Sequence, residues 1–254
     1  MSDAFMRDLD AGYRTVSDLY ERRFYKIFYS HIHPFPLLVL GQNPGGETDG
    51  TDLTASQSYF ENWEHDFVRF RFTRAYSLAS PMCRLLSDVL NTKSVEILRQ
   101  VPVSNVIFRR SRRTETLSMP VAKAARESSP FVSRIIKAVD PRCILFISKT
   151  AFELFSANHC ERQSIAVRAS TSIFTANGRN QACVFMEAEG FVLELCRRVQ
   201  FLVVGHPSKY SGRVEWKAVT EAVRLALETL DLSPIERALA PTVLPPLPEY
   251  SVTI

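Results

Sequence analysis

Residues whose types could do chemistry cluster in three short stretches of this 254-residue chain. The first is GQNPGG, residues 41–46, which directly follows the apolar run LLVL. Gly41 allows the chain to turn sharply, Pro44 stiffens the turn, and the two glycines after it let backbone approach a ligand closely. Asn43 is therefore either a good turn residue or a reactive amide that the turn holds over a ligand.

The second stretch is VVGHPSKYSGR, residues 203–213, in which His206 follows an apolar run. A histidine in this position is either structural or catalytic. The residues after it offer hydroxyl groups and positive charge for phosphates, and one aromatic ring that could wedge into a base stack. These residues are Ser208, Lys209, Tyr210, Ser211 and Arg213.

The third stretch is VPVSNVIFRRSRRTETL, residues 101–117. Asn105 lies inside an apolar strand, where an amide is costly unless it is hydrogen-bonded. It is either a core amide satisfied by backbone or an amide that faces a pocket and reads the edge of a base. The arginines after it form a basic face, which is what phosphate binding requires beside such a pocket. They are Arg109, Arg110, Arg112 and Arg113.

Short apolar strands alternate with helices along the chain, and these elements would position the three stretches. We expect strands at residues 37–40, 101–108, 143–147 and 201–205, and helices at residues 4–30, 76–99, 130–139, 151–156 and 214–229. The alternation predicts an α/β fold, a three-layer α/β/α sandwich with a mainly parallel central sheet. In such sheets the site lies beyond the carboxyl ends of the strands, where all three stretches begin.

Two segments differ from this pattern. Residues 165–200 carry an Asn177-Gly178 turn between alternating stretches, which predicts a β-hairpin insertion. Residues 231–254 are rich in proline and are expected to form a tail without regular structure. We therefore expect a single domain over residues 1–230.

Composition limits the class of protein. An apolar content of 46% and a charged content of 23% are those of a soluble globular protein. The net charge of +4 is small and does not by itself indicate nucleic-acid binding, so only local clusters of basic residues could indicate it. The five cysteines are scattered without a C-x-x-C pair, so no metal or other cofactor is expected. Without a signal core or a membrane-spanning run, we expect a cytoplasmic monomer with no membrane partner.

The motifs together resemble those of the uracil-DNA glycosylase superfamily. GQNPG after a strand, a strand asparagine, the strand–helix unit ILFISKTAFELF and a strand ending in GHPS occur in the same chain order. The resemblance covers roughly residues 35–225. GxNPG combined with HPS looks most like the single-strand-selective, SMUG-like branch. Asn43 stands where the most active uracil enzymes have aspartate, and the cluster cysteines of the iron–sulfur branch are absent.

The resemblance implies a monofunctional DNA glycosylase that flips a pyrimidine nucleotide into a pocket and leaves an abasic site. Asn43 would orient the attacking water, since a carboxamide is too weakly basic to remove its proton. His206 would stabilise the charge that develops on the base oxygen. Asn105 would read the pairing edge of the base, and Gln42 and Gly45 would also contact the base.

The resemblance also assigns residues to the DNA strand and to base stacking. Tyr210 would fill the gap that base flipping leaves, and basic and hydroxyl side chains would bind phosphates. The latter are Ser208, Lys209, Arg213, Arg109, Arg110 and Arg112. The aromatic platform for the base would come from residues 59–72, with Tyr59, Phe60 and Phe67 as candidates.

Gly45 bears on which base is removed. In the most uracil-restricted branch a tyrosine at this place crowds the 5-position of the pyrimidine. Glycine predicts room for a 5-substituent, so the substrates would include 5-modified pyrimidines such as the hydroxymethylated or glycosylated cytosines of phage DNA. The Asn105 amide could pair with uracil or with cytosine after a half-turn, unless a neighbour fixes it. Such an enzyme would serve antiviral defence as readily as DNA repair.

Two other classes of function fit parts of the sequence. A catalytically silent DNA-binding member of the same fold would keep the pocket without cutting, and the replacement of aspartate by Asn43 favours it. The joint presence of Asn43, Asn105 and His206 favours an enzyme. A nucleotide-binding α/β domain is disfavoured because the chain has no GxxxxGK[ST] or GxGxxG phosphate loop.

Overall fold

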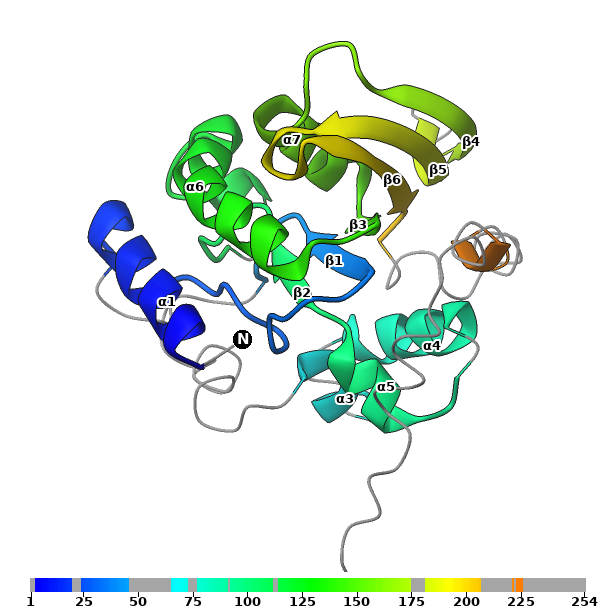
Figure 1. Cartoon of the computed structure of the whole chain (residues 1–254), viewed down its shortest axis with the longest axis horizontal. Coiled ribbons are helices and arrows are strands. Elements are labelled where there is room, and N and C mark those ends of the chain that lie inside the picture. The colour runs from blue at the N-terminus through cyan, green and yellow to red at the C-terminus, as the bar shows by residue number, and fades with distance from the viewer. Residues whose placement is uncertain are drawn as a thin grey trace, which may run out of the picture.

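The computed structural model describes residues 3–19, 24–45, 65–72, 77–90, 92–111, 114–174, 181–206, 221 and 223–225. These residues form an α/β protein with a six-stranded sheet that is flanked by helices (Figure 1). The strands are β1 (Leu37–Gly41), β2 (Val103–Asn105), β3 (Cys143–Ile147), β4 (Ala166–Phe174), β5 (Gln181–Val192) and β6 (Arg197–Val204). The helices are α1 (Asp3–Ser17), α3 (Asp66–Arg69), α4 (Ala79–Val89), α5 (Val95–Gln100), α6 (Val121–Val139) and α7 (Lys149–His159), with short 3-10 turns η2 (Thr114–Thr116) and η3 (Leu193–Leu195).

The sheet is mixed and mostly parallel, in the order β2-β1-β3-β6-β5-β4. The first four strands of that order run parallel, whereas β5 is antiparallel to both β6 and β4. The expected strands at residues 37–40 and 143–147 are confirmed as β1 and β3. Every residue of β3 is buried, as continuous apolar runs in a covered parallel sheet require. Strand β6 begins at Arg197, earlier than predicted.

The predicted β-hairpin within residues 165–200 is confirmed as the antiparallel pair β4 and β5. It is continuous with the central sheet, because β5 pairs along the full length of β6 from Val192 to Phe185. The segment therefore widens the sheet. Its expected turn at Asn177-Gly178 and the proline-rich residues 231–254 lie outside the described residues.

The prediction of a helix over residues 4–30 is wrong for the described residues beyond Ser17, which are 18–19 and 24–30. Asp18 has a positive φ of 55°, which ends α1 in the left-handed region. Residues 24–31 then run extended beside β2, where the N–H of Lys26 donates to the Phe108 carbonyl at 2.8 Å. The side chains of Tyr25, Ile27, Phe28 and Tyr29 are all buried there, so this apolar segment is covered without being helical.

Other helix boundaries also differ from the expectation. The predicted helix at residues 76–99 is two helices, α4 and α5. The chain turns after α4, where the N–H of Thr92 donates to the Ser87 carbonyl at 2.9 Å. The predicted helix at residues 130–139 begins at Val121, with Pro130 inside it. Proline removes one backbone donor there without ending the helix. Of the predicted helix at 214–229, residues 221 and 223–225 are described, and they are helical.

Helices α6 and α7 lie on one side of the strands, and α3, α4 and α5 lie on the other (Figure 1). Helix α7 contacts the sheet through aromatic rings: Phe155 lies 5.1 Å from Phe146 of β3 and 5.9 Å from Phe201 of β6. Ser148 starts α7, since its hydroxyl accepts from the N–H of Ala151 at 3.1 Å. This packing fixes the carboxyl ends of β3 and β6.

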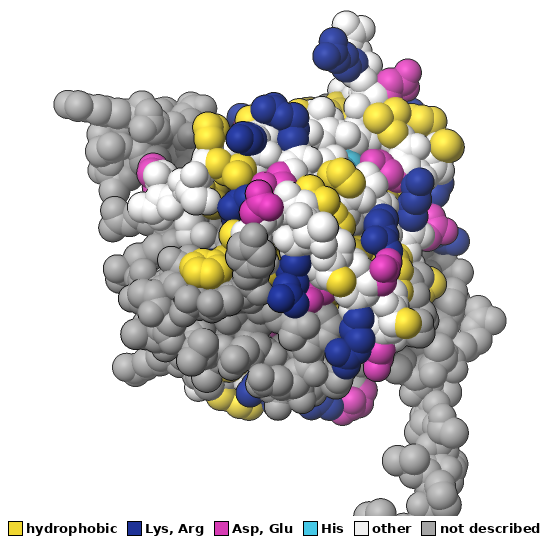
Figure 2. Space-filling view, turned by 90° about the vertical axis from the view of Figure 1, so that its left-hand side faces the viewer, with side chains coloured by type: hydrophobic (Ala, Val, Ile, Leu, Met, Phe, Trp, Pro, Cys, Tyr) yellow, Lys and Arg dark blue, Asp and Glu magenta, His cyan; other side chains and the backbone are white. Residues whose placement is uncertain are grey.

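The surface beside α1 and α6 mixes charges of both signs. Figure 2 shows Lys and Arg side chains interspersed with Asp and Glu on this face, without a broad field of one sign among the coloured atoms. A basic DNA-binding surface is therefore not visible on this side of the described protein. Within the described residues, no helix has the length and apolar character needed to cross a membrane.

Candidate active site

The turn after β1 is held along its length by the chain that follows β2. The N–H groups of Val106 and Ile107 donate to the carbonyls of Gly41 and Gln42 at 3.0 and 2.9 Å. Farther along, the N–H of Ser111 donates to the Pro44 carbonyl at 3.1 Å. These bonds explain why β2 is shorter than the predicted strand at residues 101–108: beyond Asn105 the chain pairs with the turn instead of with β1. The turn is thus a fixed platform at the sheet edge.

Asn43 uses its amide nitrogen to anchor its side chain. Nδ2 donates to the Pro44 carbonyl and to the Ser111 hydroxyl, both at 3.0 Å. The amide carbonyl Oδ1 has no hydrogen-bond partner among the residues that the structure describes. The carboxamide is therefore oriented, with an acceptor left available for a donor such as water. Ser111, which fixes it, was not singled out in the sequence, because it lies between arginines in RRSRR.

Asn105 lies directly beside Gly41 across the parallel pair of β2 and β1. It is 5% exposed, and a Cβ at position 41 would lie only 2.2 Å from its Oδ1. Glycine is therefore needed at 41 so that the amide can lie over β1. Its Nδ2 is buried and has no hydrogen-bond partner among the described residues. Buried amides are rarely left unpaired, which marks this group as a candidate ligand contact.

His206 follows β6 at the same edge and at the same level as Asn43. Gly41 and Val204 both pair with Ile147 of β3, and Asn43 and His206 each lie two residues farther on. Two strand spacings separate the axes of β1 and β6 by about 10 Å. Asn43 and His206 therefore lie on either side of the carboxyl end of β3. The structure thus brings Asn43, Asn105 and His206, one residue from each sequence stretch, to one sheet edge.

Three further residues near Asn105 were missed by the sequence reasoning: Tyr29, Lys26 and Asp66. Lys26 and Asp66 form an ion pair whose side chains are 5% and 2% exposed. The Lys26 ammonium lies 4.5 Å from the centre of the Tyr29 ring. Burial lowers the pKa of Lys26, Asp66 opposes this, and Arg110 and Arg69 lower it further. A lysine inside the aromatic run FYKIFY was a signal that such a buried pair exists.

Arg110 lies beneath the turn. It is 5% exposed, and its Nε and Nη2 both donate to the carbonyl of Gly45, at 3.1 and 2.9 Å. Its charge also lowers the pKa of Lys26 and of the Tyr29 hydroxyl, so it lies close to both. The expected phosphate contact of Arg110 stays a prediction. Its hydrogen bonds to the Gly45 carbonyl stabilise the turn after β1.

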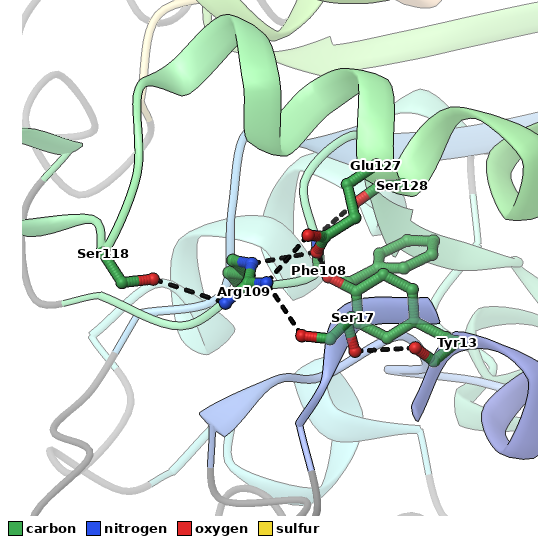
Figure 3. Close-up of polar contacts among 7 residues, drawn as sticks. All are labelled: Tyr13, Ser17, Phe108, Arg109, Ser118, Glu127 and Ser128. Carbon is green, nitrogen blue, oxygen red and sulfur yellow. Dashed lines mark hydrogen bonds and ion pairs between the residues drawn. The ribbon is translucent and has the colours of Figure 1, made fainter. Parts of the chain in front are cut away.

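Arg109, the neighbouring residue, contacts α1 and α6 (Figure 3). Its Nε and Nη2 donate to the two carboxylate oxygens of Glu127 at 2.8 and 2.7 Å. Nη2 also donates to the Ser17 carbonyl at the end of α1, at 2.9 Å. The Tyr13 hydroxyl donates to the same Glu127 carboxylate at 2.8 Å. The guanidinium therefore joins three elements of the fold, and DNA binding by Arg109 stays a prediction.

Glu127→Ala should lower the free energy of unfolding by about 2–3 kcal/mol, because it leaves a largely buried guanidinium without its carboxylate. The paired side chains are only 11% and 13% exposed. Urea unfolding checks this result, with Glu96→Ala as the control. Glu96 pairs with Arg99 on the surface, at 69% and 41% exposure, so its loss should change stability by less than about 1 kcal/mol. Equal effects of the two variants would contradict the role of Glu127.

The remaining predicted site residues divide into two groups. Gln42 and Gly45 lie in the turn, and a Cβ at Gly45 would meet no atom of the described residues within 4 Å. Phe67 is buried in α3, 6.4 Å from the Tyr29 ring. The others lie outside the described residues: Tyr59, Phe60, Arg112, Ser208, Lys209, Tyr210 and Arg213.

Comparisons with known proteins give no further assignment: no family model and no curated protein matches the chain. Within the described residues, His, Cys, Asp and Glu side chains form no group of three that could hold a metal ion. At this edge of the sheet the structure places the oriented amide of Asn43, the buried amide of Asn105 and His206.

Proposed function

We propose that the chain is a monofunctional DNA glycosylase with the three-layer fold of the uracil-DNA glycosylase superfamily. It would remove uracil-like or 5-modified pyrimidines from DNA and leave an abasic site. The observation that carries the proposal is the anchored carboxamide of Asn43, whose Nδ2 is bound by Pro44 and Ser111 while Oδ1 is left as an acceptor. This geometry suits a carboxamide that orients a water molecule by accepting a hydrogen bond from it and does not remove its proton.

In the proposed reaction the target nucleotide is flipped into the site at the strand ends. Water attacks the sugar carbon as the bond between the sugar and the base breaks, and the base departs as an anion. One hydrogen of that water would form a hydrogen bond to Oδ1 of Asn43, which directs its lone pair at the sugar carbon. The proton that the water loses on attack would neutralise the base anion, so the products are a neutral free base and a sugar hydroxyl. His206 would donate a hydrogen bond to the oxygen of the departing base.

Positive charge beside Asn105 supports an anionic leaving group. The charges of Arg110 and Arg69 both lower the pKa of Lys26, and Asp66 is the carboxylate that acts on the same lysine. The cluster therefore carries a net positive charge. In a site from which water is excluded, such a charge stabilises an anion more strongly than it does in water.

Gly45 is exposed, and its surroundings among the described residues support a substrate with a 5-substituent. A side chain there would point into space that no described residue fills within 4 Å. We propose that this space accepts a hydroxymethyl or glycosyl group on the pyrimidine, as found on modified phage DNA. Excision of such bases would leave phage genomes with abasic sites and would protect the host.

Gly45→Tyr should separate small substrates from large ones. The ring would occupy the open space, so excision of bulky 5-modified bases should fall by at least about tenfold, a change typical of altered pocket fit. Excision of plain uracil should persist, which provides the internal control that the variant is folded. Rates are measured on matched oligonucleotides under single-turnover conditions. An unchanged ratio between the two substrates would show that Gly45 does not set base size.

Strand cleavage in hot alkali tests the proposed function itself. The full-length protein is incubated with oligonucleotides that contain uracil, cytosine, 5-hydroxymethyluracil or 5-hydroxymethylcytosine, and with phage DNA that carries glycosylated cytosine. We expect alkali-sensitive sites at one or more of these bases, and none in the matched normal strand. Binding to the oligonucleotides without any such sites would favour the DNA-binding alternative. Binding only to free nucleotides would favour the nucleotide-binding alternative.

A further inference from the structure

We propose that Phe72 and Arg71 form a second contact surface for DNA, on which an unpaired base of the bound strand stacks outside the candidate active site. The surface lies at the end of α3, in residues 69–72, where arginine and phenylalanine alternate. The inference rests on the proposed function in one respect, because it takes single-stranded DNA as the ligand. It assigns a role to residues that belong to none of the three sequence stretches.

Phe72 is unusual in its exposure to solvent. It is 86% exposed, more than any other large apolar residue that the structure describes, and the next is Val16 at 60%. Phe70, two residues earlier, is partly buried and packs against the core, so the two rings of this segment have different surroundings. An exposed aromatic ring offers a stacking face to any of the four bases.

Arg71 lies over the ring of Phe72, with its guanidinium carbon 4.5 Å from the ring centre. Its Nη1 donates to the Val68 carbonyl of α3, which fixes the guanidinium beside the turn. A guanidinium has five N–H donors, so donors remain for a phosphate. A cation over an aromatic ring is also a favourable contact in itself. The pair therefore combines a surface for a base with a charge for the phosphate next to it.

The positive charge of this segment is not neutralised by carboxylates among the described residues. Asp66, the acidic residue of α3, forms its ion pair with Lys26. Arg69 and Arg71 contact aromatic rings and pair with no carboxylate in the part of the chain that the structure describes. Two such arginines beside an exposed ring match a polyanion that carries planar bases.

The end of α3 is connected to the candidate active site through residues 24–31. The N–H of Asp66 donates to the Tyr29 carbonyl at 2.7 Å, and the N–H of Tyr29 donates to the Val103 carbonyl of β2 at 3.2 Å. Strand β2 ends at Asn105. Phe72 is six residues beyond Asp66, which limits the distance between them to about 20 Å. This is the length of about six stacked nucleotides, so one DNA strand can span it. Helix α3 also lies on the side of the sheet opposite α6 and α7 (Figure 1).

Phe72→Ala tests the surface, with Val16→Ala as the matched control for loss of an exposed apolar side chain. The readout is the dissociation constant for a short labelled deoxyadenosine oligonucleotide, measured by fluorescence anisotropy. This strand has no pyrimidine for the candidate active site. We expect Phe72→Ala to raise the dissociation constant about five- to tenfold, which is the lower end of the effect of one stacked base. Val16→Ala should leave it unchanged.

Arg71→Gln tests the phosphate contact, with Arg99→Gln as its control. Arg99 pairs with Glu96 at 3.1 Å, so its charge is already neutralised. Affinity for the same strand is measured over a range of salt concentrations. Loss of one phosphate contact should lower the slope of log affinity against log salt by about 0.7 in Arg71→Gln, and Arg99→Gln should keep the slope of the parent. Equal slopes in the two variants would contradict the contact of Arg71.

Phe72→Trp provides a direct signature of stacking. This variant keeps an aromatic surface, so it should bind the strand about as tightly as the parent. Its added fluorescence, after subtraction of the parent signal, should be quenched when the strand binds. The proposal is overturned if the parent does not bind the strand, if Phe72→Ala binds as tightly as Val16→Ala, or if the added fluorescence does not change. Dimerisation of the parent that Phe72→Ala abolishes would also overturn it, since a second copy would then cover the ring.

These outcomes are distinct from those of the proposed function. A parent protein that leaves no alkali-sensitive sites, while Phe72→Ala weakens binding of the deoxyadenosine strand, would confirm the surface and contradict the glycosylase. A parent protein that excises a base, while Phe72→Ala binds the strand as the parent does, would support the glycosylase and contradict the surface.

Discussion

Asn43→Ala should slow single-turnover base excision by about 100-fold or more, which is the cost of a misplaced reacting group. The parent amide is anchored by Pro44 and Ser111, so its free Oδ1 holds one position above the turn. Alanine removes this acceptor and leaves the water without orientation. DNA affinity and melting temperature should stay close to those of the parent, because the backbone bonds of the turn are retained. Quench-flow or manual time courses on the preferred substrate give the rate.

Ser111→Ala is the graded control for this prediction. It removes one of the two anchors and leaves the amide itself, so excision should fall by only about tenfold, as for the loss of one hydrogen bond. If Asn43→Ala excises as fast as the parent, the water-orienting role of Asn43 is wrong. If Ser111→Ala is slower than Asn43→Ala, the hydroxyl of Ser111 has a role of its own.

Gly41→Ala should abolish base recognition. The added methyl group would lie 2.2 Å from Oδ1 of Asn105, nearer than non-bonded atoms approach, and the Ser104 carbonyl lies 3.8 Å away. The amide must leave its place over β1, so affinity for oligonucleotides with the target base should fall to that of the matched normal strand. Overpacking of this kind also costs about 1–3 kcal/mol of stability. Fluorescence anisotropy and urea unfolding measure the two effects.

Gly45→Ala provides the matched glycine control. It lies in the same turn, but its added methyl group would meet no atom of the described residues within 4 Å. We expect stability, and affinity for the oligonucleotide with plain uracil, within a few tenths of a kcal/mol of the parent, as for a substitution that meets no neighbour. Equal losses in the two alanine variants would mean that the turn requires glycine for its backbone and that contact with Asn105 is not the reason.

The sequence predicted the edge of the sheet where the candidate site lies, and the reason is local. Short continuous apolar runs such as LLVL and CILFI, bounded by turn residues, are typical of covered strands, and the polar residues that follow them then lie beyond the strand ends. The register of β1, β3 and β6 then places Asn43 and His206 at one level. The edge therefore followed from local patterns, whereas the register that brings Asn43 level with His206 is long-range information that the structure supplies.

The surroundings of Asn105 could not be predicted in the same way. Tyr29 and Asp66 reach the site because residues 24–31 leave the helical path after Ser17 and run beside β2. Helical periodicity does not show where a helix stops when the next segment is equally apolar. The ion pair of Lys26 with Asp66 joins residues that are far apart in sequence, and no local pattern encodes such a contact.

The two arginines after β2 illustrate a further limit. As a run of letters, Arg109 and Arg110 form one basic face. In the structure this segment is extended beside residues 24–26, and successive side chains of extended chain point in opposite directions. Arg109 therefore reaches Glu127 on α6, and Arg110 reaches Gly45 in the turn. The extended backbone therefore directs Arg109 and Arg110 to different partners, although they are adjacent in the sequence.

The central claim is that water, oriented by Asn43, cleaves the bond between a pyrimidine and its sugar. The most direct measurement is mass spectrometry of the products formed in ¹⁸O-labelled water with the oligonucleotide that gives alkali-sensitive sites. The account predicts a released free base and an abasic strand that carries one ¹⁸O atom at the sugar carbon from the earliest times, faster than a preformed abasic strand exchanges its oxygen with the same water, with both products lost in parallel in Asn43→Ala. Recovery of the intact oligonucleotide, or of a protein–DNA adduct that borohydride traps, would contradict it.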